Sequence, residues 1–76
     1  DIDAFDPSIA PGTGTPSLGV FVSYEVLELL DGLAKRWPIV GLDLVEVAPD
    51  HDPTGSTTTL AAQILMNVIG RILHHR

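Results

Sequence analysis

Residues 39–47 have the sequence IVGLDLVEV, and this stretch indicates the class of fold. It is nearly continuous in apolar residues and rich in branched ones, which is the pattern of a strand covered on both faces in a parallel sheet. Its two acids, Asp43 and Glu46, are an odd number of residues apart, so their side chains would leave opposite faces of the strand. We expect Asp43 to be a buried structural acceptor and Glu46 to lie at the carboxyl end of the strand.

Helical periodicity flanks this predicted strand on both sides. From Ser23, the expected N-cap, apolar residues recur at helical spacing until Trp37, where a Trp-Pro pair would end the helix. After the turn APDHDPTG, the sequence predicts a second helix over about residues 56–73. Asp52 or Thr54 is expected to cap that helix.

Residues 1–5 alternate acidic and apolar side chains before an Asp-Pro pair, which fits the carboxyl end of another strand. Residues 7–19 then hold three prolines and three glycines, the composition of an ordered, tightly turned loop. The order strand end, helix, strand, helix is typical of α/β domains. Because a strand covered on both faces needs neighbours, we expect residues 1–76 to be the C-terminal part of a larger domain, with the N-terminal remainder absent from this chain.

The composition excludes several classes of site and partner. Without cysteine, the 76 residues can form neither a disulfide nor a thiolate metal site. A formal charge of −6 disfavours binding to nucleic acid or to an anionic membrane and favours a cationic ligand. No apolar run approaches the roughly 18 residues that a membrane span requires.

Asp1 and Asp3 are the first candidate ligands. Two apart on an extended segment, they would point to the same face, at the carboxyl end of a strand, where open α/β sheets bind ligands. Oxygen donors favour Mg²⁺, Ca²⁺ or Mn²⁺. A solvated strand end or turn explains the same spacing equally well. The EF-hand pattern fails, because Asp6 and Gly12 stand where it requires glycine and glutamate.

Glu46 is the second candidate. A strand-end carboxylate can simply pair with a nearby base or N–H group, or it can hold a guanidinium through two parallel hydrogen bonds. His51, His74 and His75 have no metal-ligand spacing with the aspartates, so we expect no ligand role for them.

Taken together, DIDAFDPSIAPGTGTP and GLDLVEVAPDHDPTG resemble the ureohydrolase family, the arginase and agmatinase group, over essentially the whole chain. Within this family, the sequence VEVAP resembles agmatinase or a guanidino-acid hydrolase most. The resemblance implies the C-terminal part of a three-layer αβα domain with a parallel sheet. It also implies a pair of Mn²⁺ ions in each active site and hydrolysis of a guanidinium group to urea and an amine.

The resemblance also implies roles for individual residues. Asp1 and Asp3 would be metal ligands, and Glu46 would bind the substrate guanidinium. Thr13 and Thr15 would stand behind these residues in the cleft wall APGTGTP. The remaining metal ligands lie outside these 76 residues, so the fragment alone would be inactive.

The implied partners are a small cationic guanidino substrate such as agmatine, the N-terminal part of the same domain, and further copies in a homo-oligomer. The implied location is the cytoplasm, or an organelle if a targeting segment precedes Asp1. Two alternatives stay open: a non-catalytic ureohydrolase-like protein that acts by binding or assembly, and an acidic α/β fragment with a structural Mg²⁺ or Ca²⁺.

Overall fold

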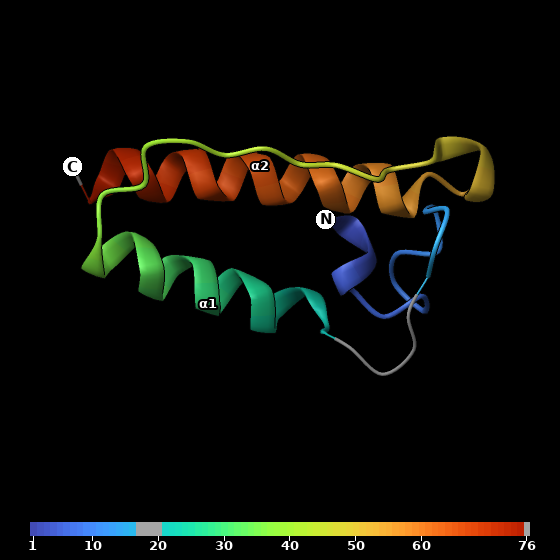
Figure 1. The fold of residues 1–76 in the computed structure, drawn as a ribbon, viewed down its shortest axis with the longest axis horizontal. Helices are drawn as coiled ribbons and strands as arrows, with labels where there is room; N and C mark the ends of the chain where they lie inside the picture. The colour runs from blue at the N-terminus through green and yellow to red at the C-terminus, as the bar shows by residue number, and fades with distance from the viewer. Residues whose placement is uncertain (17–20, 76) are drawn as a thin grey trace.

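Two helices and the segments that connect them make up the computed structural model of the chain, which describes residues 1–16 and 21–75. In chain order the elements are η1, α1, η2 and α2, where η denotes a short 3₁₀ helix. Their bounds are Ile2–Ala4, Ser23–Arg36, Pro49–His51 and Ser56–His74. The helices α1 and α2 lie side by side, with η1 near one end of the pair (Figure 1). Residues 17–19 of the predicted loop lie outside the described residues.

The start of α1 differs by one residue from the prediction. Val22 is the N-cap and Ser23 is the first helical residue, so the expectation that Ser23 caps the helix was wrong. The Glu25 carboxylate accepts a hydrogen bond from Val22 N at 3.0 Å and so satisfies an N–H group that the helix leaves open. The predicted end is confirmed, because Trp37 is the C-cap and its N–H donates to the Leu33 carbonyl at 3.0 Å.

The helix α2 matches the predicted second helix to within one residue. Gly55 is its N-cap, with a φ of 76° in the left-handed region that favours glycine. Both residues expected to cap the helix contact its first turn. The Asp52 carboxylate accepts from Thr57 N at 2.8 Å, and Thr54 Oγ1 accepts from Ser56 N at 3.3 Å.

Residues 39–47 are not assigned to a strand, so the predicted parallel sheet is not found among the described residues. The segment instead runs past α2 (Figure 1), and its Leu44 and Val47 pack against the core. A strand needs backbone pairing along its edges, and within this segment the described residues supply one such bond, from Ile2 N to the Val45 carbonyl at 3.1 Å. For the same reason Asp43 is exposed, which corrects the expectation that it is buried.

The first five residues were also expected to be extended, and they are not. Ile2–Ala4 form the 3₁₀ helix η1, and only Phe5 makes a parallel bridge, to Phe21. Asp1 Oδ1 accepts from Asp3 N at 3.0 Å and so caps the turn. Asp and Asn side chains often stabilise turns in this way, and here the side-chain bond prevails over the strand-like alternation of residues.

A small apolar core joins α2 to the N-terminal segment. It consists of Ile2, Phe5, Ala10, Ala61, Ile64 and Val68. Among the partly buried residues packed against it, α1 contributes Val26, Leu27 and Leu30. Burial of Ile2, which is 1% exposed, fixes the turn that carries Asp1 and Asp3. Within the part of the chain that the structure describes, neither α1 nor α2 is long and apolar enough to cross a membrane.

Asp31 connects the two helices by ion pairs. Its carboxylate contacts Lys35 Nζ on α1 at 3.2 Å, and Arg71 Nη1 and His75 Nε2 from the C-terminal segment at 3.1 and 3.3 Å. The hydrogen bond from Lys35, with the contributions of His75 and Arg71, holds the pKa of Asp31 below its ordinary value of 3.8, although desolvation opposes the shift.

We predict that Asp31→Asn lowers the melting temperature near pH 7. A carboxylate with a lowered folded-state pKa stabilises the fold above its ordinary pKa of 3.8, and the contribution is lost as the pH falls through the folded value. The difference in melting temperature between wild type and variant should therefore close toward roughly pH 3. Thermal melts at a series of pH values between 7 and roughly 3 measure this difference. Glu28→Gln, an exposed position on the same helix, is the matched control. A gap that is independent of pH would contradict the ion-pair explanation.

Candidate functional site

The turn η1 holds the two candidate metal ligands outside the core. Asp1 is exposed and Asp3 is half-buried, while Ile2 between them is buried. Thr15 Oγ1 donates to Asp3 Oδ2 at 2.9 Å. Asp1 Oδ2 and Asp3 Oδ1 have no hydrogen bond to the described residues. Each carboxylate thus keeps one free oxygen, which is the donor type that a hard divalent cation prefers.

Glu46 is connected to this turn by a backbone hydrogen bond of the residue that precedes it. The hydrogen bond from Ile2 N ends on the carbonyl of Val45, the residue before Glu46. The structure therefore brings the three residues Asp1, Asp3 and Glu46 into neighbouring parts of the fold, although 45 positions separate the first from the last in the sequence. Their roles as ligands and as the guanidinium-binding group stay predictions.

Glu46 has a φ of 72°, the one positive value among the described residues other than glycine. The left-handed conformation costs a residue with a side chain roughly 1 to 2 kcal/mol. The left-handed conformation persists where neighbouring contacts hold the backbone in place, and such contacts exist on both sides of Glu46. Val45 accepts from Ile2, and two residues after Glu46 the N–H of Ala48 donates to the Gly12 carbonyl at 2.6 Å.

The two threonines of the loop APGTGTP lie in different surroundings. Thr15 is exposed and contacts Asp3 through its hydroxyl group. Thr13 is 1% exposed, and its Oγ1 is buried without a hydrogen-bond partner among the described residues. Its N–H donates to the Pro11 carbonyl at 2.9 Å, which tightens the loop at this point.

Asp52 is a buried carboxylate, 5% exposed, with hydrogen bonds to both oxygens. Oδ1 accepts from the hydroxyl and the N–H of Thr54, and Oδ2 accepts from Ser56 Oγ at 2.9 Å and from N and Oγ1 of Thr57, both at 2.8 Å. These bonds, the Thr54 hydroxyl first and then the two groups of Thr57, hold the pKa of Asp52 far below its usual range. Asp52 therefore acts as an ionised acceptor at neutral pH.

Gly12 connects the loop to this network and to the segment after Glu46. Its N–H donates to Thr57 Oγ1 at 2.8 Å, and its carbonyl accepts from Ala48 N. A Cβ atom at Gly12 would lie 2.9 Å from the Cβ atoms of Asp52 and Thr57 and from Thr57 Oγ1. We call these four residues, Gly12, Ala48, Asp52 and Thr57, the Gly12 junction.

Sequence reasoning predicted that Asp52 or Thr54 caps α2, and both accept hydrogen bonds from N–H groups of its first turn, but it missed the junction. The run of hydroxyl residues after Asp52 does signal local side-chain to backbone bonds. Nothing in that run indicates that the Thr57 hydroxyl also accepts from Gly12, 45 residues earlier. The glycine itself carried the only further signal, because glycine is the residue that permits close approach of two segments.

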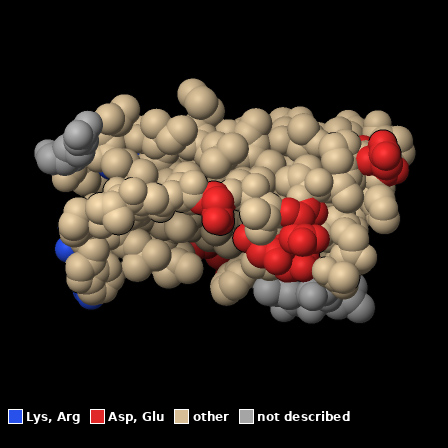
Figure 2. Space-filling model, turned by 45° about the horizontal axis from the view of Figure 1, so that its top comes forward, with Lys and Arg blue, Asp and Glu red and all other residues tan. Residues whose placement is uncertain are grey.

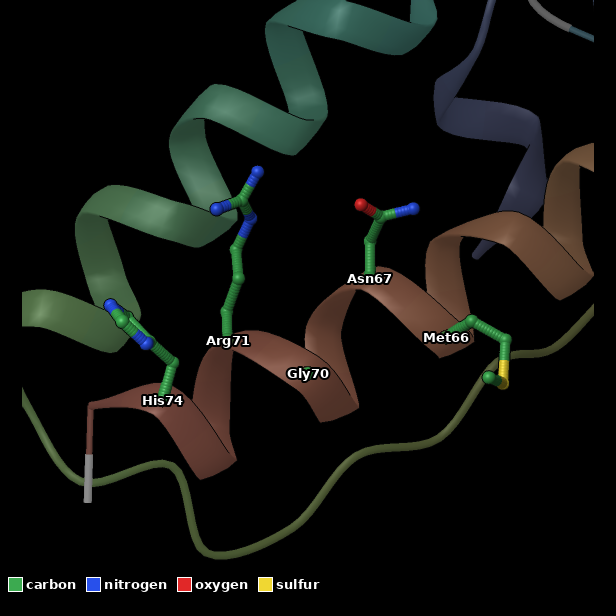
Figure 3. Close-up of a pocket in the computed structure, with 5 residues that line it drawn as sticks. All are labelled: Met66, Asn67, Gly70, Arg71 and His74. Atoms are coloured by element: carbon green, nitrogen blue, oxygen red, sulfur yellow. The ribbon is translucent and has the colours of Figure 1, made fainter.

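The hollows in the surface lie away from the candidate site. One, of about 370 Å³, is lined by Met66, Asn67, Gly70, Arg71 and His74 on α2 (Figure 3). A second, of about 670 Å³, lies around Trp37 and Ile72. In the described part of the chain, no group of three or more His, Asp and Glu side chains could hold a metal ion.

The charge of the surface is mostly negative. Figure 2 shows Asp and Glu side chains gathered on one face, with a further acidic group at one end of the molecule and Lys and Arg at the other end. Together with the formal charge of −6, this distribution favours approach of a cation.

Comparison with known proteins gives consistent matches. The model of the arginase family matches residues 1–70. Guanidinobutyrase of Pseudomonas aeruginosa is 42% identical over 91% of this chain and 21% of its own length. Mitochondrial agmatinase of Gallus gallus is 46% identical over 91% of this chain and 20% of its own. The structure of proclavaminate amidino hydrolase from Streptomyces clavuligerus aligns with a TM-score of 0.92 and 41% identity, over 100% of this chain and 25% of that one. The chain thus spans about a fifth of the length of these curated relatives.

We predict that Glu46→Gly melts at a higher temperature than Glu46→Ala. Both variants remove the carboxylate, but only glycine adopts a φ of 72° without a steric cost, so it should be favoured by about 1 kcal/mol. Thermal melts of both variants, made in the full reading frame that encodes these residues, measure the difference. Gly55, which among the described residues is the other one with positive φ, supplies the control, because Gly55→Ala should lose stability. Equal melting temperatures of the two Glu46 variants would contradict the interpretation that the backbone at Glu46 is strained.

Proposed function

This chain belongs to the arginase family, and from that premise we propose that it forms part of a binuclear manganese hydrolase that splits a guanidino substrate into urea and an amine. Its relatives carry the names agmatinase, guanidinobutyrase and amidino hydrolase, which supports a hydrolase of the same group. The observation that carries the proposal is the bond from Ile2 N to the Val45 carbonyl, which joins the Asp1–Asp3 turn to the segment of Glu46. An agmatine-like substrate suits the likeness to agmatinase.

Asp1 and Asp3 would hold metal through their free carboxylate oxygens. Bound divalent ions of this kind lower the pKa of a water molecule and supply a hydroxide at neutral pH. Two carboxylates do not complete a binuclear site, so the remaining ligands would come from outside the described residues. Thr15 would restrict the rotation of Asp3 by its hydrogen bond to Oδ2, which leaves Oδ1 for the cation.

Glu46 would bind and orient the substrate. Its exposed carboxylate can accept two parallel hydrogen bonds from a planar guanidinium, a geometry that fixes both distance and plane. The strained backbone at Glu46 supports a functional role, because such outliers concentrate at ligand sites. Thr13 would contribute a buried hydroxyl to the wall of the cleft.

The segment 39–47 supports a larger assembly around this site. Its exposed apolar residues, such as Val40 at 97%, and its sparse backbone pairing fit a strand that pairs with sequence outside the described residues. We therefore propose that the remainder of an arginase-like αβα domain supplies the neighbouring strands.

We predict different losses for Asp3→Ala and Glu46→Gln in the full reading frame. Asp3→Ala should lose bound Mn²⁺ and activity together, because a ligand is removed. Glu46→Gln should retain Mn²⁺ and lose about 1.5 to 3 kcal/mol of substrate binding, because the guanidinium loses its charged partner. Urea release and metal content per chain measure the two effects. Asp50→Asn, an exposed acid within η2, serves as the control.

The substrate is identified by urea release from agmatine, arginine and 4-guanidinobutyrate with Mn²⁺ present. Agmatine is expected to be the best of the three. Metal binding without urea release from any guanidino compound would favour the non-catalytic alternative, and wild-type activity in both variants would refute the assignment of the two residues.

A further inference from the structure

The Gly12 junction closes a circuit of hydrogen bonds around the candidate site. Starting from Asp3, the circuit passes to Thr15, along the loop to Gly12, and across to Ala48. It continues back through Glu46 to Val45, which accepts from Ile2, the neighbour of Asp3. The spacing between the Asp1–Asp3 turn and Glu46 therefore depends on where Gly12 lies.

Gly12 is in turn placed by the first turn of α2. Its N–H donates to Thr57 Oγ1, and the same hydroxyl donates its hydrogen to Asp52 Oδ2. An ionised carboxylate can only accept, so the hydroxyl hydrogen of Thr57 is directed at Asp52 and an oxygen lone pair is left for Gly12. Asp52 thus fixes the orientation of the one group that holds the Gly12 N–H.

This arrangement exceeds what a helix cap requires. A cap needs one or two bonds to the N–H groups of the first turn, which Asp52 provides through Thr57 N. The carboxylate also accepts hydrogen bonds from the hydroxyls of Thr54, Ser56 and Thr57. Gly12 comes into contact with Asp52 and Thr57 at the same place. The helix end is therefore fitted to the loop as well as capped.

We propose that Asp52 and Thr57 are positioning residues, which act through Gly12 and Ala48 to set the location of Glu46 relative to Asp1 and Asp3. The inference rests on the proposed function, because it assigns the junction a task in the binding of the guanidino substrate. The left-handed backbone of Glu46 is the part of the circuit that most needs support, and Ala48 is held only two residues away from it.

Thr57→Val tests the inference, because valine keeps the shape of threonine and lacks the hydroxyl. In the full reading frame loaded with Mn²⁺, the variant should raise the KM for agmatine by about tenfold, as expected when a remote change misplaces a binding group. Metal content should stay at the wild-type level. Thr57→Ser, which keeps the hydroxyl, should restore KM to within about twofold, and Thr58→Val, on the exposed face of the same turn, should match wild type.

KM distinguishes positioning from a merely structural role. Partial unfolding reduces the number of active molecules and lowers the apparent kcat, but the molecules that remain bind substrate normally. If Thr57→Val fails to fold, Asp52→Asn provides the same readout, because its amide nitrogen cannot accept and at least two of the hydrogen-bond donors lose their acceptor.

Three outcomes decide the question. A raised KM with retained metal and rescue by serine supports the inference. An active wild type with unchanged KM in the valine and asparagine variants overturns the inference alone. A wild type that binds Mn²⁺ but releases no urea from guanidino compounds refutes the proposed function, and this inference with it.

Discussion

The backbone of Gly12 is held on both sides, at its N–H and at its carbonyl, and the arrangement of the candidate site depends on that constraint. Its N–H is bound by Thr57 at the start of α2, and its carbonyl binds Ala48 just after Glu46. Because Gly12 is buried and both its N–H and its carbonyl are paired, moving either partner segment would leave a buried polar group unpaired, at a cost of roughly 1 to 3 kcal/mol. One residue thus couples a loop, a helix end and the segment that carries Glu46.

Around this constraint the molecule divides its tasks. The helices supply stability, through the apolar core around Ile64 and Val68 and through the ion pairs of Asp31. The loops supply the candidate chemistry, as is common when rigid elements position functional groups. Two hydrogen bonds, from Ile2 to Val45 and from Thr15 to Asp3, are enough to connect the start of the sequence with its middle.

The helices could be predicted from the sequence because their signals are local. Apolar spacing, the hydrogen bond of Asp52 to the first turn of α2 and the stop at Trp37 all act within a few residues. Strand formation is not local, and residues 39–47 carry the strand pattern but have no neighbouring strand in the described residues. The turn at Asp1–Asp3 was mistaken for a strand end because alternation over five residues cannot be distinguished from a capped turn. The Gly12 junction was out of reach, since it joins positions 45 residues apart.

The exposed apolar side chains of residues 39–47 affect how this chain behaves when it is isolated in solution. Val40, Leu42 and Val45 are exposed, and the backbone beside them is largely without partners among the described residues. An open, apolar edge of this kind is a template on which other chains can pair. Isolated in solution, the chain would be drawn into concentration-dependent self-association, and its solubility would report how completely that edge is covered.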